Sequence, residues 1–133
     1  MEIIEKMTRE TAQAEFEKWV YETKKLRPVA VEKNADACRD FVDALCDGTL
    51  TIEEDGSVTQ KLSFAVAGRD QLKYKPRLTV SEMGTALDVR GGDSAKTRKM
   101  VSILTGEVVG VLDKMDSSDW ALSTAIAAFY FLA

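Results

Sequence analysis

The side chains that could carry out chemistry in this chain of 133 residues do not include histidine, which is absent. Histidine is the commonest general base and metal ligand, so its absence excludes Ser-His pairs, Cys-His pairs and switches based on imidazole titration. Serines are present, but none has an imidazole to activate it; they include Ser57, Ser63, Ser102 and Ser118. We therefore expect that the protein is not an enzyme, and we assign no catalytic residue.

The two cysteines are the next candidates for chemistry. Cys38 and Cys46 fall on one predicted helix, and a helix rise of about 12 Å between them is too long for a disulfide. A structural zinc site needs more thiolate or imidazole ligands than this chain offers. The sequence predicts two reduced, buried thiols, with no metal site and no cofactor.

Two short polar segments match ligand-binding loops only in part. Residues 53–57 are acidic but lack the alternating oxygen ligands and the later glutamate of a calcium loop, so we interpret them as a hairpin tip. Residues 90–94, Arg-Gly-Gly-Asp-Ser, lack the further glycines and the Gly-Lys-Ser/Thr step of a phosphate-binding loop. We interpret this second segment as a turn between helices.

The charge balance disfavours nucleic acid as a partner. The chain has 18 Lys and Arg against 22 Asp and Glu, a net charge of −4, which is the wrong sign for neutralising phosphates. Basic clusters at residues 24–27 and 96–99 lie among acids, and we interpret each as a solvated helix face. The first residues do not match a signal peptide, and the most apolar run, residues 120–133, is shorter than a membrane span. We expect a cytoplasmic protein with no membrane partner.

Two helices are predicted in the first 48 residues. Thr8 is placed to cap the first helix, which carries an apolar stripe and ends before Pro28. The second covers about residues 34–46, with apolar residues at i, i+3, i+4, i+7 and i+8 and Gly48 placed to end it. The inward residues are Ala12, Phe16, Trp19 and Val20 on the first helix and Cys38, Phe41, Val42, Leu45 and Cys46 on the second.

The rest of the chain alternates between strand and helix patterns. Residues 49–76, with turn sequences at 55–56 and 68–70, predict an antiparallel three-stranded meander. A capping box at residues 79–82 starts a helix with Val80, Met83 and Leu87 facing inward. The next helix begins at residue 93 or 94 and ends at Gly106. A short helix follows, and the last helix begins at residues 116–119. The inward residues of the first two of these helices are Met100, Val101 and Leu104, then Val108, Val111, Leu112 and Met115. The predicted fold class is α+β, a small three-stranded antiparallel meander with about five to six helices packed around it, in a single domain.

The last predicted helix is apolar on almost every side. One interpretation is ordinary burial of one face in the core. The other is an apolar surface that meets another chain, since a small domain seldom buries its last helix completely. On the second interpretation the partner-binding residues are Trp120, Ile126, Phe129, Tyr130, Phe131 and Leu132, and the helix could also pair between copies in a homo-oligomer.

The second half of the chain carries a distinctive order of segments. A strand pair ends in a basic, proline-containing step at residues 72–80, which leads into a short helix. The sequence SILTGEVVGVLDKM follows at 102–115, and an acidic step at 116–119 leads into the apolar helix at 120–132. In this order residues 62–132 resemble the tail assembly chaperones of long-tailed bacteriophages. Residues 1–48 resemble the helical N-terminal extension of some members, which leaves 49–133 as the meander and its helices.

This resemblance implies a non-enzymatic protein of the infected cell. It would bind the tape measure protein, keep the hydrophobic helices of that protein soluble, and help to recruit tail tube protein in the host cytoplasm. Members of the family are usually absent from the finished particle. The alternatives are a structural tail or head-to-tail joining subunit that remains in the virion, a small enzyme, and an adaptor or antitoxin-like regulator.

Overall fold

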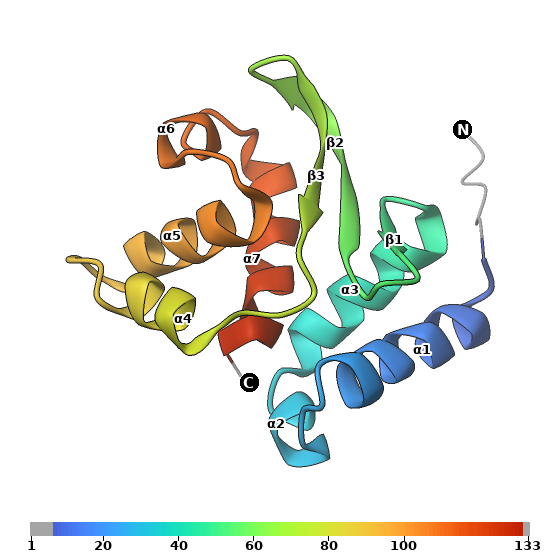
Figure 1. The fold of residues 1–133 in the computed structure, drawn as a ribbon. Coiled ribbons are helices and arrows are strands. Elements are labelled where there is room, and N and C mark those ends of the chain that lie inside the picture. Colours follow the sequence, from blue (N-terminus) through green and yellow to red (C-terminus); the bar gives the residue numbers. More distant parts are fainter. Residues whose placement is uncertain (1–6, 132–133) are drawn as a thin grey trace.

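The computed structural model describes residues 7–131, in which a small antiparallel sheet packs against a set of helices (Figure 1). The α+β fold with a three-stranded meander is confirmed. This part of the chain has seven α-helices, one more than the predicted range, because a short helix begins at Pro28, where proline fits the first helical position. In chain order the elements are α1 (Arg9–Lys18), the π-helical turn η1 (Trp19–Thr23), α2 (Pro28–Glu32), α3 (Ala35–Asp47), β1 (Leu50–Ile52), β2 (Val58–Val66), β3 (Arg69–Tyr74), α4 (Val80–Leu87), α5 (Asp93–Thr105), α6 (Val109–Leu112) and α7 (Ser117–Phe131).

The predicted limits of the two helices in the first 48 residues are confirmed by α1 with η1 and by α3. Thr8 caps α1 by accepting a hydrogen bond from the Thr11 backbone N–H at 3.2 Å, and the predicted stripe of α1 and η1 is buried. Helix α3 ends at Gly48, whose φ of 84° lies in the left-handed region. Helix α1 changes into η1, after which the Lys24 N–H donates to the Trp19 carbonyl, five residues back, at 2.8 Å. This wider turn leads the chain into the interior at Lys24, which is only 5% exposed.

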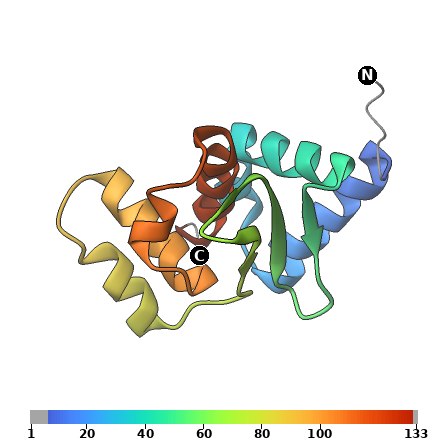
Figure 2. The same cartoon turned by 90° about the horizontal axis from the view of Figure 1, so that it is seen from above.

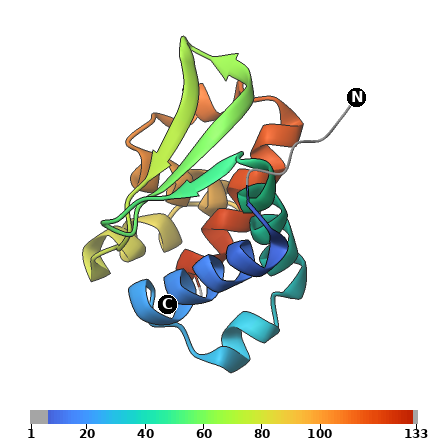
Figure 3. The same ribbon diagram turned by 90° about the vertical axis from the view of Figure 1, so that its right-hand side faces the viewer.

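The sheet has the strand order β1-β2-β3, and both pairs are antiparallel. The acidic residues 53–57 connect β1 to β2, as predicted. The β2–β3 turn lies slightly earlier than predicted, because Ala67 and Gly68 have positive φ values of 49° and 79° while Arg69 and Asp70 belong to β3. Two such values in succession are typical of the two-residue turn that matches strand twist. Figure 3 shows this hairpin extending beyond the helices.

Helix α7 is the centre of the fold. It packs against α3, α5 and β2, with α1 and α3 on one side and α4 and α5 on the other (Figures 1 and 2). The Phe129 ring lies 5.4, 5.9 and 5.7 Å from the rings of Phe16, Trp19 and Phe41, measured between centroids. Trp19 in turn stacks on Phe41 at 4.9 Å. The N-terminal helices and the last helix therefore share one hydrophobic core.

A buried polar network fixes α7 on the sheet. The Tyr74 hydroxyl donates to Gln60 Oε1 at 2.7 Å, and the Gln60 side-chain amide donates to the Asp119 carbonyl at 2.9 Å. The Ser123 hydroxyl lies 2.8 Å from both the Tyr74 hydroxyl oxygen and Gln60 Oε1. Since buried polar groups are costly unless they are paired, this network specifies one position of α7 over β2 and β3.

The Asp119 carboxylate makes a second connection between α7 and β2. It accepts hydrogen bonds from the Ser63 N–H at 2.9 Å and the Phe64 N–H at 3.0 Å. Both amides lie where the β2–β3 register shifts, between Lys61 and Val66. The carboxylate thus satisfies backbone donors of β2 in an irregular part of the sheet.

The predicted orientation of α4 is wrong at both of its ends. Val80 is 91% exposed and Leu87 is 47% exposed, although both were expected to face inward. Helix α4 packs on α5 with Ala86 fully buried and Met83 partly buried. This rotation turns Val80 and Leu87 away from the core. Val108 is also exposed, because it precedes the short helix α6 as its N-terminal flanking residue.

Replacing Asp119 with alanine should destabilise the fold. Two amides of β2 would lose their acceptor, and we expect the free energy of unfolding to fall by about 2 kcal/mol, measured by urea denaturation. Asp113→Ala is the matched control, because Asp113 is half exposed and makes only a 3.6 Å ion pair with Arg98. The control should lose less than about 1 kcal/mol. Equal losses in the two variants would contradict the role given to Asp119.

Candidate functional site

The predicted partner-binding residues of α7 separate into three groups. Ile126, Phe129 and Tyr130 are fully buried in the core, so the expectation that they form an exposed apolar surface is wrong. Trp120 and Phe131 are half-buried against the same core. Leu132 lies outside the described residues. The physical reason is that α7 is covered on several sides, by α3, α5 and β2, so most of its apolar surface packs within this chain.

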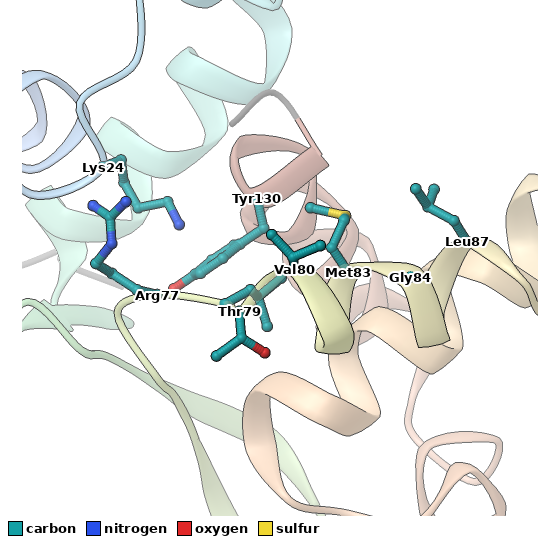
Figure 4. Close-up of a pocket in the computed structure, with 9 residues that line it drawn as sticks. Lys24, Arg77, Thr79, Val80, Met83, Gly84, Leu87 and Tyr130 are labelled. Atoms are coloured by element: carbon teal, nitrogen blue, oxygen red, sulfur yellow. The ribbon is translucent and has the colours of Figure 1, made fainter.

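The main exposed apolar surface beside a pocket lies on α4 instead. Val80 and Leu87 are exposed one above the other along α4, since residues seven apart fall on the same helix face. They border a pocket of about 420 Å³ between α4, the end of α7 and the chain that follows η1 (Figure 4). The lining residues are Lys24, Arg77, Leu78, Thr79, Val80, Met83, Gly84, Leu87 and Tyr130.

Local interactions of the segment between β3 and α4 position this wall of the pocket. The Lys75 N–H donates to the Leu104 carbonyl of α5 at 3.0 Å, and the Lys75 amine pairs with the Glu82 carboxylate. The predicted capping box is confirmed: Thr79 Oγ1 accepts from the Glu82 N–H at 3.2 Å, and Glu82 Oε1 accepts from the Thr79 N–H at 3.0 Å. Helix α4 therefore begins at a fixed point, next to Arg77 and Leu78.

The opposite wall is built around the amine of Lys24. Its Nζ donates to the Pro76 carbonyl at 3.2 Å and lies 3.4 Å from the centroid of the Tyr130 ring. This is a cation–π contact, which is stronger when the cation is withdrawn from water. The Tyr130 hydroxyl donates to the Lys75 carbonyl at 2.7 Å, which holds the ring in place as the floor of the pocket.

Two cations share one end of the pocket. Figure 4 shows Lys24 and Arg77 together at one end, Leu87 at the other, and Tyr130 and Val80 between them. Burial, and to a smaller extent the positive charge of Arg77, lowers the pKa of Lys24 to about 7. Within residues 7–131 no ion pair joins either cation to a carboxylate. Chemically, the arrangement is an apolar groove with a positively charged end.

Sequence reasoning missed the role of Lys24, because the cluster 24–27 was interpreted as a solvated helix face. The available signal was position: Lys24 continues the inward stripe of Trp19 and Val20. The thiol prediction was more accurate. Both cysteines are free, Cys46 is buried and Cys38 is half-buried, and burial raises the pKa of the Cys38 thiol.

Comparisons with known protein families, with curated proteins and with solved structures found no match to this chain. Among the described residues, no cluster of three or more acidic or cysteine side chains is arranged to hold a metal ion. None of the helices in residues 7–131 has both the length and the apolar character needed to cross a membrane. The groove beside α4 is the candidate functional site because it combines an exposed apolar helix face with the side chains of Lys24 and Arg77.

The stability of the protein should depend on pH through Lys24. Between about pH 7 and pH 10 the unfolded chain binds a proton on Lys24 that the folded chain does not, so this lysine makes the free energy of unfolding rise with pH. Lys24→Met removes the buried charge and should flatten that rise. Urea denaturation of both proteins at several values from pH 6 to pH 9 measures the difference. Parallel pH profiles for the two proteins would contradict the lowered pKa.

Phe129→Ala should damage the core rather than a binding surface. Removing this ring leaves a cavity between α7, α1 and α3, and we expect a loss of about 3–5 kcal/mol in the free energy of unfolding. Phe131→Ala, at a half-buried position, should cost clearly less. Thermal or urea denaturation compares them. Equal, small losses would show that Phe129 is not central to the core.

Proposed function

We propose that this protein is a tail assembly chaperone of a long-tailed bacteriophage, which binds apolar segments of the tape measure protein in the host cytoplasm and assists tail tube assembly. The sequence support is the order of segments over residues 62–132. The structural observation on which the proposal rests is the apolar surface of α4 beside the pocket, with Val80 91% exposed.

The groove has the properties needed to receive an apolar helix. Val80, Met83 and Leu87 follow the i, i+3, i+7 spacing along α4, so a helix laid beside them would cover all three side chains. Burying such side chains releases ordered water and stabilises a complex by roughly 25 cal/mol for each Å² of apolar surface removed from solvent. The same contacts would cover apolar surface of the tape measure protein during assembly.

Gly84 lies at the middle of this surface. A Cβ at this position would have no heavy atom within 4 Å, so the space above the glycine is open. A glycine within a helix lowers helix stability by about 1 kcal/mol relative to alanine. Its presence is explained here by close approach of a partner helix to α4.

Co-expression with the tape measure protein of the same phage tests the proposal. We expect the wild-type protein to retain the tape measure protein in a pull-down, and Val80→Asp/Leu87→Asp to reduce retention at least about tenfold. Val29→Asp and Val108→Asp are matched controls, because these valines are 62% and 66% exposed outside the groove. Retention by the double variant equal to that of the controls would contradict the proposal.

Gly84→Leu separates binding from folding. Leucine favours the helix more than glycine does, so the free energy of unfolding should stay equal or rise by up to about 1 kcal/mol. The new side chain would fill the open space of the groove and lower retention of the tape measure protein. Circular dichroism during urea denaturation and the same pull-down measure the two effects. A stabilised variant that binds normally would exclude this groove as the binding site.

Mass spectrometry of purified virions distinguishes a chaperone from a structural subunit. A chaperone should be absent from the finished particle or present in trace amounts. Many copies per virion would favour a tail or head-to-tail joining subunit instead.

A further inference from the structure

We propose that the segment bound in the groove carries an aspartate or glutamate side chain at the end formed by Lys24 and Arg77. This inference rests on the proposed function, because it specifies the chemistry of the partner that the α4 groove receives. The rest of the groove is apolar, so the partner is an apolar helix with one acidic residue placed at a defined end.

The first argument is the set of unused donors at this end of the pocket. A lysine amine has three N–H donors and an arginine guanidinium has five. Lys24 donates to the Pro76 carbonyl at 3.2 Å, and Arg77 donates to the Thr23 carbonyl at 2.9 Å. Neither side chain forms an ion pair with a carboxylate in the part of the chain that the structure describes. Donors therefore remain for a ligand that enters the pocket.

The second argument is electrostatic. Lys24 is buried, and the charge of Arg77 disfavours a second positive charge beside it. A carboxylate placed between the two groups would offset this repulsion and form charge-assisted hydrogen bonds with the buried amine and the guanidinium. A neutral residue would leave both cations unpaired, and a lysine on the partner would add a third like charge. The site thus discriminates against partners without an acid at this position.

The same geometry gives the complex a definite pH dependence. The groups that face the Lys24 amine are the Tyr130 ring of α7, the Pro76 carbonyl and the guanidinium of Arg77. Of these, Arg77 stays charged at all relevant pH values, and burial raises the pKa of the Tyr130 hydroxyl. Lys24 is therefore the group that titrates near neutrality. Because the carboxylate favours the protonated amine, affinity should decrease as the pH rises above about 7.

Three synthetic peptides provide the test. Each is an acetylated, amidated leucine-alanine helix that differs only at one position near its end, which holds Glu, Gln or Lys. Fluorescence polarisation of labelled peptides measures binding to the full chain at pH 6.5 and pH 8.5. We expect the Glu peptide to bind at least about tenfold more tightly than the other two at pH 6.5. This preference should shrink at pH 8.5.

Variants of Lys24 and Arg77 test whether these two residues cause the preference for the Glu peptide. Lys24→Met and Arg77→Gln should each reduce the preference for the Glu peptide over the Gln peptide. Lys25→Gln is the matched control, because Lys25 belongs to the same basic cluster but is exposed. Circular dichroism establishes that each variant is folded.

The possible outcomes separate this inference from the proposed function. Equal binding of the Glu and Gln peptides would overturn the acidic partner while leaving an apolar groove that binds helices. No binding of any peptide would also overturn it, even if the tape measure protein were retained in the pull-down through another surface. Sedimentation that shows a dimer, lost in Val80→Asp, would assign the groove to a second copy of this chain and overturn the inference.

Discussion

The enclosure of α7 is the constraint on which the rest of the structure depends. A helix that is apolar on almost every side cannot lie on a surface at low cost, so the fold supplies partners around it. Phe129 packs against the aromatic rings of α1, η1 and α3. Ser123 and Asp119, nearer the start of the same helix, form hydrogen bonds with the sheet. The aromatic rings bury apolar surface of α7 in the core. The polar network fixes the rotation of α7 about its axis and its position along β2 and β3.

The same enclosure creates the candidate site. Tyr130 is buried next to Phe129, and its ring lies 6.1 Å from that of Trp19, so it belongs to the core. The same ring contacts the Lys24 amine, and its hydroxyl donates a hydrogen bond to the Lys75 carbonyl. The floor of the pocket is therefore part of the hydrophobic core. The wall formed by α4 is different, because it packs mainly on α5 and leaves Val80 in solvent. A charged end and an exposed apolar wall suit a partner that is recognised by both shape and charge.

The helices and strands were predicted well from the sequence because the interactions that form them join residues close together in the chain. The stripe on α1, the left-handed glycine after α3, the capping box of α4 and the alternation in the strands all depend on residues close in sequence. The site was harder to predict because its causes are not local. Periodicity identifies an all-apolar helix such as α7 but does not tell a central helix from one that meets a partner. The direction of α4 depends on Ala86 packing on α5, and the burial of Lys24 depends on Tyr130, which is distant in sequence.

The π-helical turn η1 has a consequence for how the charge of the groove is encoded. An α-helix places a residue about every 100° around its axis, and η1 departs from that spacing just before Lys24. If the same residues of Trp19–Thr23 kept α-helical spacing, the side chains that follow would be rotated around the axis by close to one such step. The groove would then lose its amine although no residue that lines it had been replaced. The position of this amine is thus determined by the backbone geometry of a neighbouring segment as much as by the identity of the side chain.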